Sequence, residues 1–204
     1  YDTIPSEGGV ETDVNKVFEN LYDFIDPTEH YHPQEAPNSC AVAVQTDILN
    51  DFGINVSEAQ MRELAENMGV YTHSGGTPLS DVGKLIEAHG IELDPQRDGF
   101  DLSYLVDAKN SGEKIIIGLD AAEIWNSPDI LDNPIETYTG GLIEIASAGH
   151  AVEFKGVFED FDGNIFVVID DPGHPDGNNV HVPINDFLDA WSDFGNFAVI
   201  TKTK

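Results

Sequence analysis

The spacing of apolar residues predicts helices in the first part of the chain. Residues 14–25 place apolar side chains on one stripe, and an apolar run over 40–52 predicts a second helix. Ser57 and Gln60 have the spacing of a capping box, so a third helix is expected to begin there and to stop at Gly69.

Two more helices and a short strand are expected before the pattern changes. Glycine and proline residues at 75–78 indicate a tight turn, after which Thr77 caps a helix that closes at Gly90. Residues 91–93 are interpreted as a short strand, and residues 102–110 as a helix that is followed by a glycine.

The second half of the chain has the pattern of strands instead. Residues 114–119 form a continuous apolar run that is typical of a buried strand, and residues 150–158 alternate between apolar and polar positions. Asp162-Gly163 is a favourable hairpin turn before a strand at 165–169. The rest of the pattern consists of an irregular stretch at 120–141, a loop at 172–179, a helix at 184–192 and a closing strand at 197–202.

Helices followed by an antiparallel sheet indicate an α+β fold. We expect residues 1–12 to be a mobile lead-in and residues 13–204 to form a single domain, which suits the length of the chain. Within this domain, a helical lobe covers about 13–112 and a sheet lobe covers about 113–204.

The charge of the chain is unusual, because 38 acidic residues outnumber 9 basic ones and give a formal net charge of −29. Such a surface repels polyanions, so nucleic acids and anionic membranes are poor partners. The apolar runs are too short for a transmembrane segment, and a single cysteine excludes an intrachain disulfide framework. We expect a monomeric, secreted or cell-surface protein of bacterial or archaeal origin; a high-salt habitat is the alternative explanation of the acidity.

The single cysteine, Cys40, lies at the predicted start of a helix, where the helix dipole favours a thiolate. Far along the chain, His150 opens one predicted strand and Asp170-Asp171 closes the next. This is the order of a Cys-His-Asp hydrolase. Adjacent strand residues point to opposite faces, so only one of the two acids, Asp170 or Asp171, can orient His150. Gln34 offers its side-chain amide to an oxyanion, together with the backbone N–H of Cys40.

At these positions the chain resembles the papain-like cysteine peptidases. It is most similar to the bacteriocin-leader (double-glycine) peptidase family and its stand-alone relatives, and the resemblance covers about residues 30–175. The motifs that carry it are Gln34-x5-Cys40, Gly149-His150 at a strand start, and Asp171-Pro172 at the end of the following strand.

The resemblance implies a papain-like fold with a helical lobe, a mostly antiparallel sheet lobe and a cleft between them. It also implies that Cys40 is the nucleophile, His150 the base and Asp171 the acid that orients the histidine, while Gln34 lines the oxyanion hole. The expected activity is hydrolysis of a peptide or isopeptide bond in a peptide or protein substrate, through a thioacyl intermediate and with no cofactor or metal.

Three other functions stay open. The same groups serve an acyltransferase or amidase, because transfer to an amine needs the same thiol and base as transfer to water. Ser39 and Ala41 differ from the aspartate and glycine of many family members, which motivates a catalytically inactive peptide-binding module of a larger acidic protein. Residues 160–164 contain part of a calcium loop, although a hairpin turn is the favoured interpretation. Trp125 and Trp191 are interpreted as core or lobe-interface residues.

Overall fold

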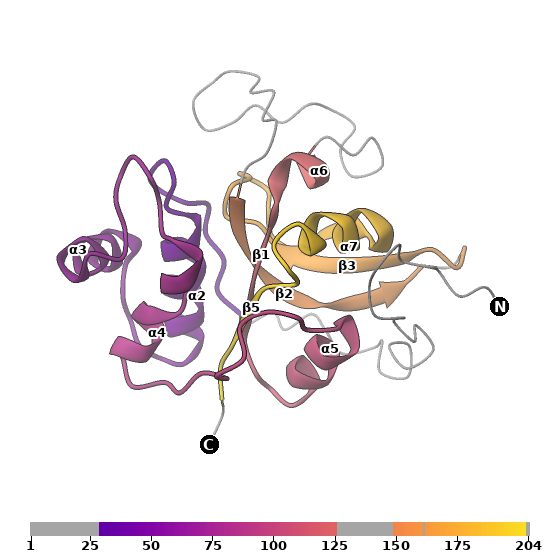
Figure 1. Cartoon of the computed structure of the whole chain (residues 1–204), viewed down its shortest axis with the longest axis horizontal. Helices are drawn as coiled ribbons and strands as arrows, with labels where there is room; N and C mark the ends of the chain where they lie inside the picture. Colours follow the sequence, from indigo (N-terminus) through magenta and orange to yellow (C-terminus); the bar gives the residue numbers. More distant parts are fainter. Residues whose placement is uncertain (1–28, 126–148, 161, 203–204) are drawn as a thin grey trace.

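The computed structural model describes residues 29–125, 149–160 and 162–202, which form helices around one antiparallel sheet (Figure 1). Five strands are hydrogen bonded in the order β4-β3-β2-β1-β5. They are β1 (Ile115–Asp120), β2 (Gly149–Glu159), β3 (Ile165–Asp170), β4 (Val180–Pro183) and β5 (Ala198–Ile200). The expected lead-in at 1–12, the expected helix at 14–25 and most of the stretch at 120–141 lie outside the described residues.

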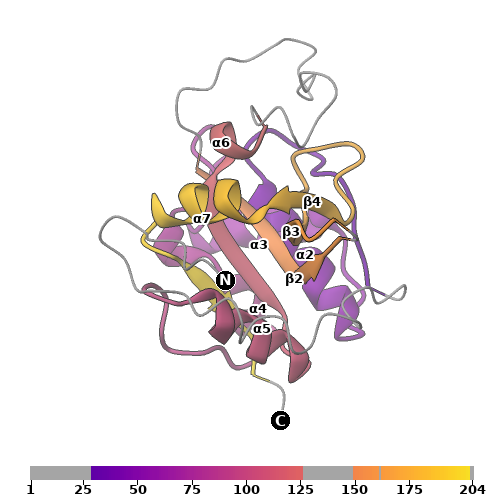
Figure 2. The same ribbon diagram turned by 90° about the vertical axis from the view of Figure 1, so that its right-hand side faces the viewer.

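Helices cover both faces of this sheet. Figure 1 shows α2 (Cys40–Asp51), α3 (Glu58–Met68) and α4 (Lys84–Ala88) on one side, and α5 (Leu102–Asn110) and α7 (Ile184–Ser192) on the other. Figure 2 looks onto α7 and α5, with the sheet and then α2, α3 and α4 behind them. The expected α+β fold is therefore confirmed.

The apolar run of β1 explains why both faces are covered. All six residues of β1 are buried, and their side chains alternate between the two faces. Ile116 packs in one cluster with Ile48 of α2, whereas Ile115 and Ile117 pack in another cluster with Leu105 of α5. Although α5 belongs to the predicted helical lobe, it packs across the sheet from α2.

The third predicted helix begins and ends at the expected residues. Ser57 Oγ accepts the backbone N–H of Gln60 at 3.3 Å, and Gln60 Oε1 accepts the backbone N–H of Ser57 at 2.9 Å. Gly69 ends α3 with a φ of 71°, in the left-handed region. The predicted capping box is therefore confirmed.

The prediction of one continuous helix between Thr77 and Gly90 is wrong. Pro78 rather than Thr77 precedes a single 3₁₀ turn, η2 (Leu79–Asp81), and α4 begins only after Gly83. Gly83 has a φ of 97°, and a Cβ atom there would lie 2.8 Å from Leu93 Cδ1. The chain therefore breaks where only glycine combines a positive φ with such a close approach.

A buried glutamine of α2 stabilises this break. Gln45 is 1% exposed, and its Oε1 accepts the backbone N–H of Gly83 at 2.9 Å and that of Leu85 at 3.1 Å. Its Nε2 donates to the carbonyl of Ala41 at 2.8 Å. One side chain thus satisfies the start of α4 and joins it to α2.

Short elements account for the other differences from the predicted pattern. The strand expected at 91–93 is reduced to one bridge between Leu93 and Thr201. Conversely, β4 occupies residues 180–183, which the pattern left unassigned between the expected loop and the helix at 184–192. The short helix α6 (Ala121–Trp125) forms where an irregular stretch was expected. No helix in the part of the chain that the structure describes is long and apolar enough to cross a membrane.

The predicted hairpin between β2 and β3 is confirmed. Gly163 has a φ of 86° in the turn, and Asp160 Oδ1 accepts the backbone N–H groups of Asp162 at 2.9 Å and Asn164 at 2.8 Å. The Asp160 carboxylate is therefore used to cap the turn.

Candidate active site

Cys40 is the first residue of α2, and its side chain is partly exposed. Burial of the sulfur raises the pKa of the thiol, but attraction to His150, a hydrogen bond with His150 and the N–H groups of Ala151 and Ala41 lower it by more. The pKa of Cys40 therefore lies below its ordinary value, as expected for a thiol at a helix N-terminus beside an imidazolium.

His150 and Asp171 meet at the same end of the sheet. Glu153 of β2 pairs with Asp170 of β3, so His150 near the start of β2 lies beside the residue that follows β3. His150 Nε2 lies 2.5 Å from Asp171 Oδ1, and the side chains are 6% and 3% exposed. This contact leaves Nδ1 as the ring nitrogen that faces Cys40.

The charges of the row formed by Cys40, His150 and Asp171 stabilise one another. Burial lowers the pKa of His150, but Asp171 and Cys40 raise it by more, to about 10. Burial likewise raises the pKa of Asp171, whereas His150, the Trp125 side chain and the Gly173 N–H lower it below its ordinary value. The favoured charge state is therefore a thiolate, an imidazolium and a carboxylate in sequence.

The structure distinguishes between the two adjacent acids. Asp171 contacts His150, while Asp170 accepts the backbone N–H of Asn179 at 2.6 Å and lies 3.2 Å from Lys155 Nζ. The alternation of side chains at the end of β3 sends the two carboxylates in different directions, as the sequence predicts.

Gln34 lies beside this row without entering the cavity next to it. Its backbone N–H donates to the carbonyl of Pro172 at 2.8 Å, and its side-chain Nε2 donates to the carbonyl of Ala36 at 2.9 Å. The contact with Pro172 joins the loop before Cys40 to the loop after Asp171. The role of Gln34 in an oxyanion hole stays a prediction.

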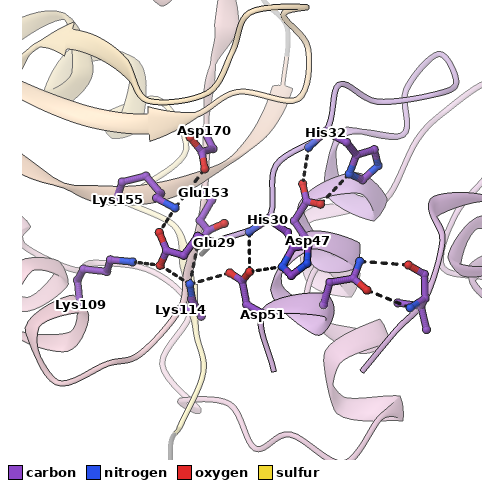
Figure 3. Close-up of polar contacts among 12 residues, drawn as sticks. Glu29, His30, His32, Asp47, Asp51, Lys109, Lys114, Glu153, Lys155 and Asp170 are labelled. Carbon is purple, nitrogen blue, oxygen red and sulfur yellow. Dashed lines mark hydrogen bonds and ion pairs between the residues drawn. The ribbon is translucent and has the colours of Figure 1, made fainter. Parts of the chain in front are cut away.

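Residues 29–34, which we call the strap, lead the chain to Cys40 and are held by ionic contacts (Figure 3). His32 Nδ1 lies 2.7 Å from Asp47 Oδ1 of α2, and His32 Nε2 lies 3.1 Å from Glu58 Oε2 of α3. These two hydrogen bonds raise the pKa of His32 to about 10, against the lowering effect of burial. Glu58 also accepts the backbone N–H of Glu35 at 2.7 Å. The strap is thus fixed against both helices.

The start of the strap is fixed to the sheet in the same way. Figure 3 shows Glu29 among the ammonium groups of Lys109, Lys114 and Lys155. Burial raises the pKa of Glu29, but hydrogen bonds from the three lysines lower it by more, so that it falls from 4.5 to about 2. This cluster connects the strap to α5, to the residue before β1 and to β2.

Three carboxylates of this region have the spacing of a cation site. They belong to Glu29, Asp51 and Glu153. Lys114 Nζ contacts Glu29, lies 2.7 Å from Asp51 Oδ2 and lies 3.8 Å from Glu153 Oε1. The cation among these carboxylates is therefore the Lys114 ammonium.

A cavity of about 300 Å³ opens beside Cys40 and His150. Five apolar side chains line it: Leu79, Val82, Ile117, Phe194 and Phe197. A Cβ atom on Gly118 would lie 3.0 Å from Leu79 Cδ1, and one on Gly149 would lie 3.2 Å from Phe194 Cζ. Glycine at these two positions therefore leaves room for the apolar wall.

Sequence reasoning did not identify Trp125 as part of the site. Its Nε1 donates to Asp171 Oδ2 at 2.8 Å, and its ring centroid lies 5.2 Å from that of His150. Nothing in the sequence predicts this contact, because Trp125 is far from the other site residues and its short helix lies in a stretch without a clear pattern.

Sequence comparison finds distant relatives that carry no assigned function. No family model matches the chain. An uncharacterised protein of Mycobacterium tuberculosis is 22% identical over 200 residues, which cover 84% of this chain and 80% of that protein. A Mycobacterium bovis protein gives the same values.

Two solved structures share the architecture. A Bacillus anthracis protein assigned as a C39-like peptidase has a TM-score of 0.60 at 21% identity, covering 87% of this chain and 96% of its own. The peptidase domain of Streptococcus ComA, a bifunctional ABC transporter of a quorum-sensing pathway, has a TM-score of 0.55 at 20% identity, covering 84% and 96%. The chain therefore has the fold of C39-like, papain-like peptidases, as the sequence resemblance predicts.

Proposed function

We propose that this protein is a cysteine peptidase that cleaves peptide or isopeptide bonds with Cys40, His150 and Asp171. The observation that carries the proposal is the hydrogen-bonded row of these three side chains at the mouth of an apolar cavity. The peptidase assignments of both solved neighbours support the same class of reaction. An imidazole and a carboxylate are costly to bury as charged groups, so their burial beside a partly exposed thiol favours a functional site.

In the first step, the Cys40 thiolate attacks the carbonyl carbon of the substrate amide and forms a carbon–sulfur bond. The backbone N–H of Cys40 and the Gln34 side-chain N–H that does not bind the Ala36 carbonyl stabilise the oxyanion that develops. As the carbon–nitrogen bond breaks, the His150 imidazolium gives its proton to the leaving amine. The products are a thioester on Cys40, a neutral imidazole and a free amine.

In the second step, water attacks the thioester carbonyl while His150 removes its proton. The carbon–sulfur bond breaks, the acid product leaves, and the thiolate–imidazolium pair is restored. Asp171 keeps its negative charge throughout and holds the ring so that Nδ1 faces the sulfur. The apolar cavity accommodates an uncharged side chain of the substrate next to the scissile bond.

Thiol reactivity tests the central pair. At pH 6 an ordinary thiol is mostly protonated, so iodoacetamide should alkylate Cys40 about one to two orders of magnitude faster than a free cysteine. His150→Ala should remove this advantage, while His181→Ala on the exposed edge strand should keep it. Equal rates in wild type and His150→Ala would contradict a working pair and favour a peptide-binding module.

Product analysis tests the reaction itself. Incubation with a mixed peptide library should give cleavage products in mass spectrometry, and Cys40→Ala should give none. A parallel incubation with an added primary amine separates water from amine as the acceptor, because an acyltransferase would form the amide adduct in preference to the free acid.

A further inference from the structure

Asp171 has more hydrogen-bond donors than its contact with His150 needs. Oδ1 faces His150 and also accepts the Gly173 backbone N–H at 2.8 Å, while Oδ2 accepts the indole N–H of Trp125 at 2.8 Å. Each oxygen of the carboxylate is thus fixed by a donor other than the imidazole. A carboxylate held in this way has one orientation, although its terminal torsion is ordinarily broad.

The indole reaches Asp171 because α6 places it there. α6 continues directly from β1, its residue Ile124 is buried in the core, and Trp125 packs against the same cluster. On the other side, a Cβ atom on Gly173 would lie 2.8 Å from Trp125 Cζ2 and 2.9 Å from His150 Cε1. The indole, the imidazole and the turn after Asp171 are therefore packed together as tightly as a core.

We propose that Trp125 is a positioning residue of the peptidase, whose indole N–H holds Asp171 in the orientation that faces His150. This inference rests on the proposed roles of Cys40 and His150, but it adds a residue that acts through Asp171 rather than on the substrate. Without the indole N–H, Oδ2 loses its donor, and only the two contacts of Oδ1 with Gly173 and His150 hold the carboxylate. Asp171 is then less well fixed beside the imidazolium, and less of Cys40 is a thiolate at neutral pH.

The chain offers a matched control for this proposal, because it contains two tryptophans. Trp191 is fully buried, and its indole N–H donates to the carbonyl of Phe197 at 2.8 Å. Trp125→Phe and Trp191→Phe therefore remove the same donor from the same kind of ring. Only the first of these substitutions removes a hydrogen bond to Asp171.

The experiment measures alkylation of Cys40 by iodoacetamide at pH 6 and at pH 11 in both variants. At pH 6, Trp125→Phe should react about three- to tenfold more slowly than wild type, whereas Trp191→Phe should match wild type. At pH 11 the thiol ionises without help, so all three rates should converge. A merely structural loss would slow the reaction at both pH values, because it would change access to the sulfur.

A second readout uses the fluorescence of Trp125 itself. In Trp191→Phe the remaining tryptophan contacts His150, and a protonated imidazole quenches indole emission. Emission should rise as His150 loses its proton at alkaline pH, and alkylation of Cys40 should move this transition to lower pH. Emission that does not change with pH would mean that Trp125 does not contact a titrating His150, and would overturn the proposal.

The two proposals fail in different ways. If wild-type Cys40 is no more reactive at pH 6 than a free thiol, the peptidase assignment itself fails. If wild type is reactive but Trp125→Phe and Trp191→Phe have equal rates at pH 6, the peptidase assignment stands and the role of Trp125 is wrong.

Discussion

Glu153 is a buried acid in the strand that carries His150. It is 1% exposed, and burial raises its pKa to about 8 in spite of the lowering effect of Lys155, Lys114 and Lys109. The cluster holds four carboxylates and three lysines, so one excess negative charge is relieved when Glu153 keeps its proton. Near neutral pH the folded protein therefore binds a proton that the unfolded chain has lost.

Glu153→Gln should accordingly remove a pH dependence of stability. The folded pKa lies above the ordinary value of 4.5, so wild type loses stability as pH rises from about 5 to 8 and then levels off. The free energy of unfolding of the variant should match that of wild type near pH 5. As the pH rises toward 8, it should exceed the wild-type value by a difference that grows by up to about 1.4 kcal/mol per pH unit. Urea unfolding at several pH values measures this, with the exposed Glu159→Gln of the same strand as a control. A constant difference across this range would contradict the assignment of a proton to Glu153.

At the residue scale, motifs identified the three side chains of the candidate site but not their surroundings. Cys40, His150 and Asp171 are recognisable because their order and their places at element ends are unusual. Trp125 and Glu153 are not, because the importance of each depends on which side chains the tertiary fold brings to it. In the sequence, a tryptophan or a strand glutamate that lies at the site looks the same as one that lies elsewhere in the fold.

The central helix, α2, connects the site to the rest of the molecule. Its first residue is Cys40, and its middle and end carry the polar residues Gln45, Asp47 and Asp51, which bind α4, the strap and Lys114. A buried helix ordinarily has few polar side chains. Here they join α2 to several neighbours and so fix the position of the Cys40 sulfur relative to them.

Gln45→Leu should test how much one such connection contributes to the free energy of unfolding. The substitution keeps the volume but leaves the N–H groups of Gly83 and Leu85 without their acceptor, at a cost of about 2–4 kcal/mol in the free energy of unfolding. Gln60→Ala, which removes one half of the exposed capping box, should cost about 1 kcal/mol. Urea denaturation measures both values. Equal costs would mean that another group satisfies the break before α4.

Elements with a long, regular pattern were predictable, and those decided by tertiary contacts were not. The helix that starts at Ser57 carries its own start and stop signals, so local chemistry determines it. The break at Gly83 depends on a glutamine from another helix and on the approach of Leu93. The edge strand β4 is four residues long and ends in proline, so neither its length nor its composition could indicate a strand.

At the scale of the whole molecule, the main feature is the excess of acidic over basic residues. Lys109, Lys114 and Lys155, three of the nine basic residues, have side chains 13%, 13% and 2% exposed and are used inside the cluster around Glu29. The same cluster also holds four carboxylates, so the remaining 34 acidic and 6 basic residues still carry a formal net charge of −28, and like charges among them repel one another. The sequence predicted the sign and size of this charge, but not where the lysines lie.

Added salt should therefore stabilise the protein. The screening length falls from about 8 Å at 0.15 M salt to about 3 Å at 1 M, which weakens repulsion between surface acids. We expect the melting temperature to rise by about 5 °C or more between 0.1 and 2 M NaCl, equivalent to roughly 1–2 kcal/mol. A melting temperature that is independent of salt would show that repulsion between these acids costs little.

A charge variant separates screening from general effects of salt. Glu63→Lys with Glu66→Lys changes two exposed positions of α3, and each replacement adds two positive charges, so the net charge moves from −29 to −25. The melting temperature of this double variant should be higher than that of wild type at low salt and should rise less steeply with NaCl.

The distance along the chain between Cys40 and its two partners has a consequence during synthesis. The ribosome makes α2 long before it makes His150 and Asp171, and β2 must pair with β1 before an imidazole can reach the sulfur. A nascent chain therefore carries an ordinary thiol with no base beside it. A copy that ends before His150 therefore keeps a cysteine that lacks the imidazole by which the folded protein lowers the pKa of Cys40.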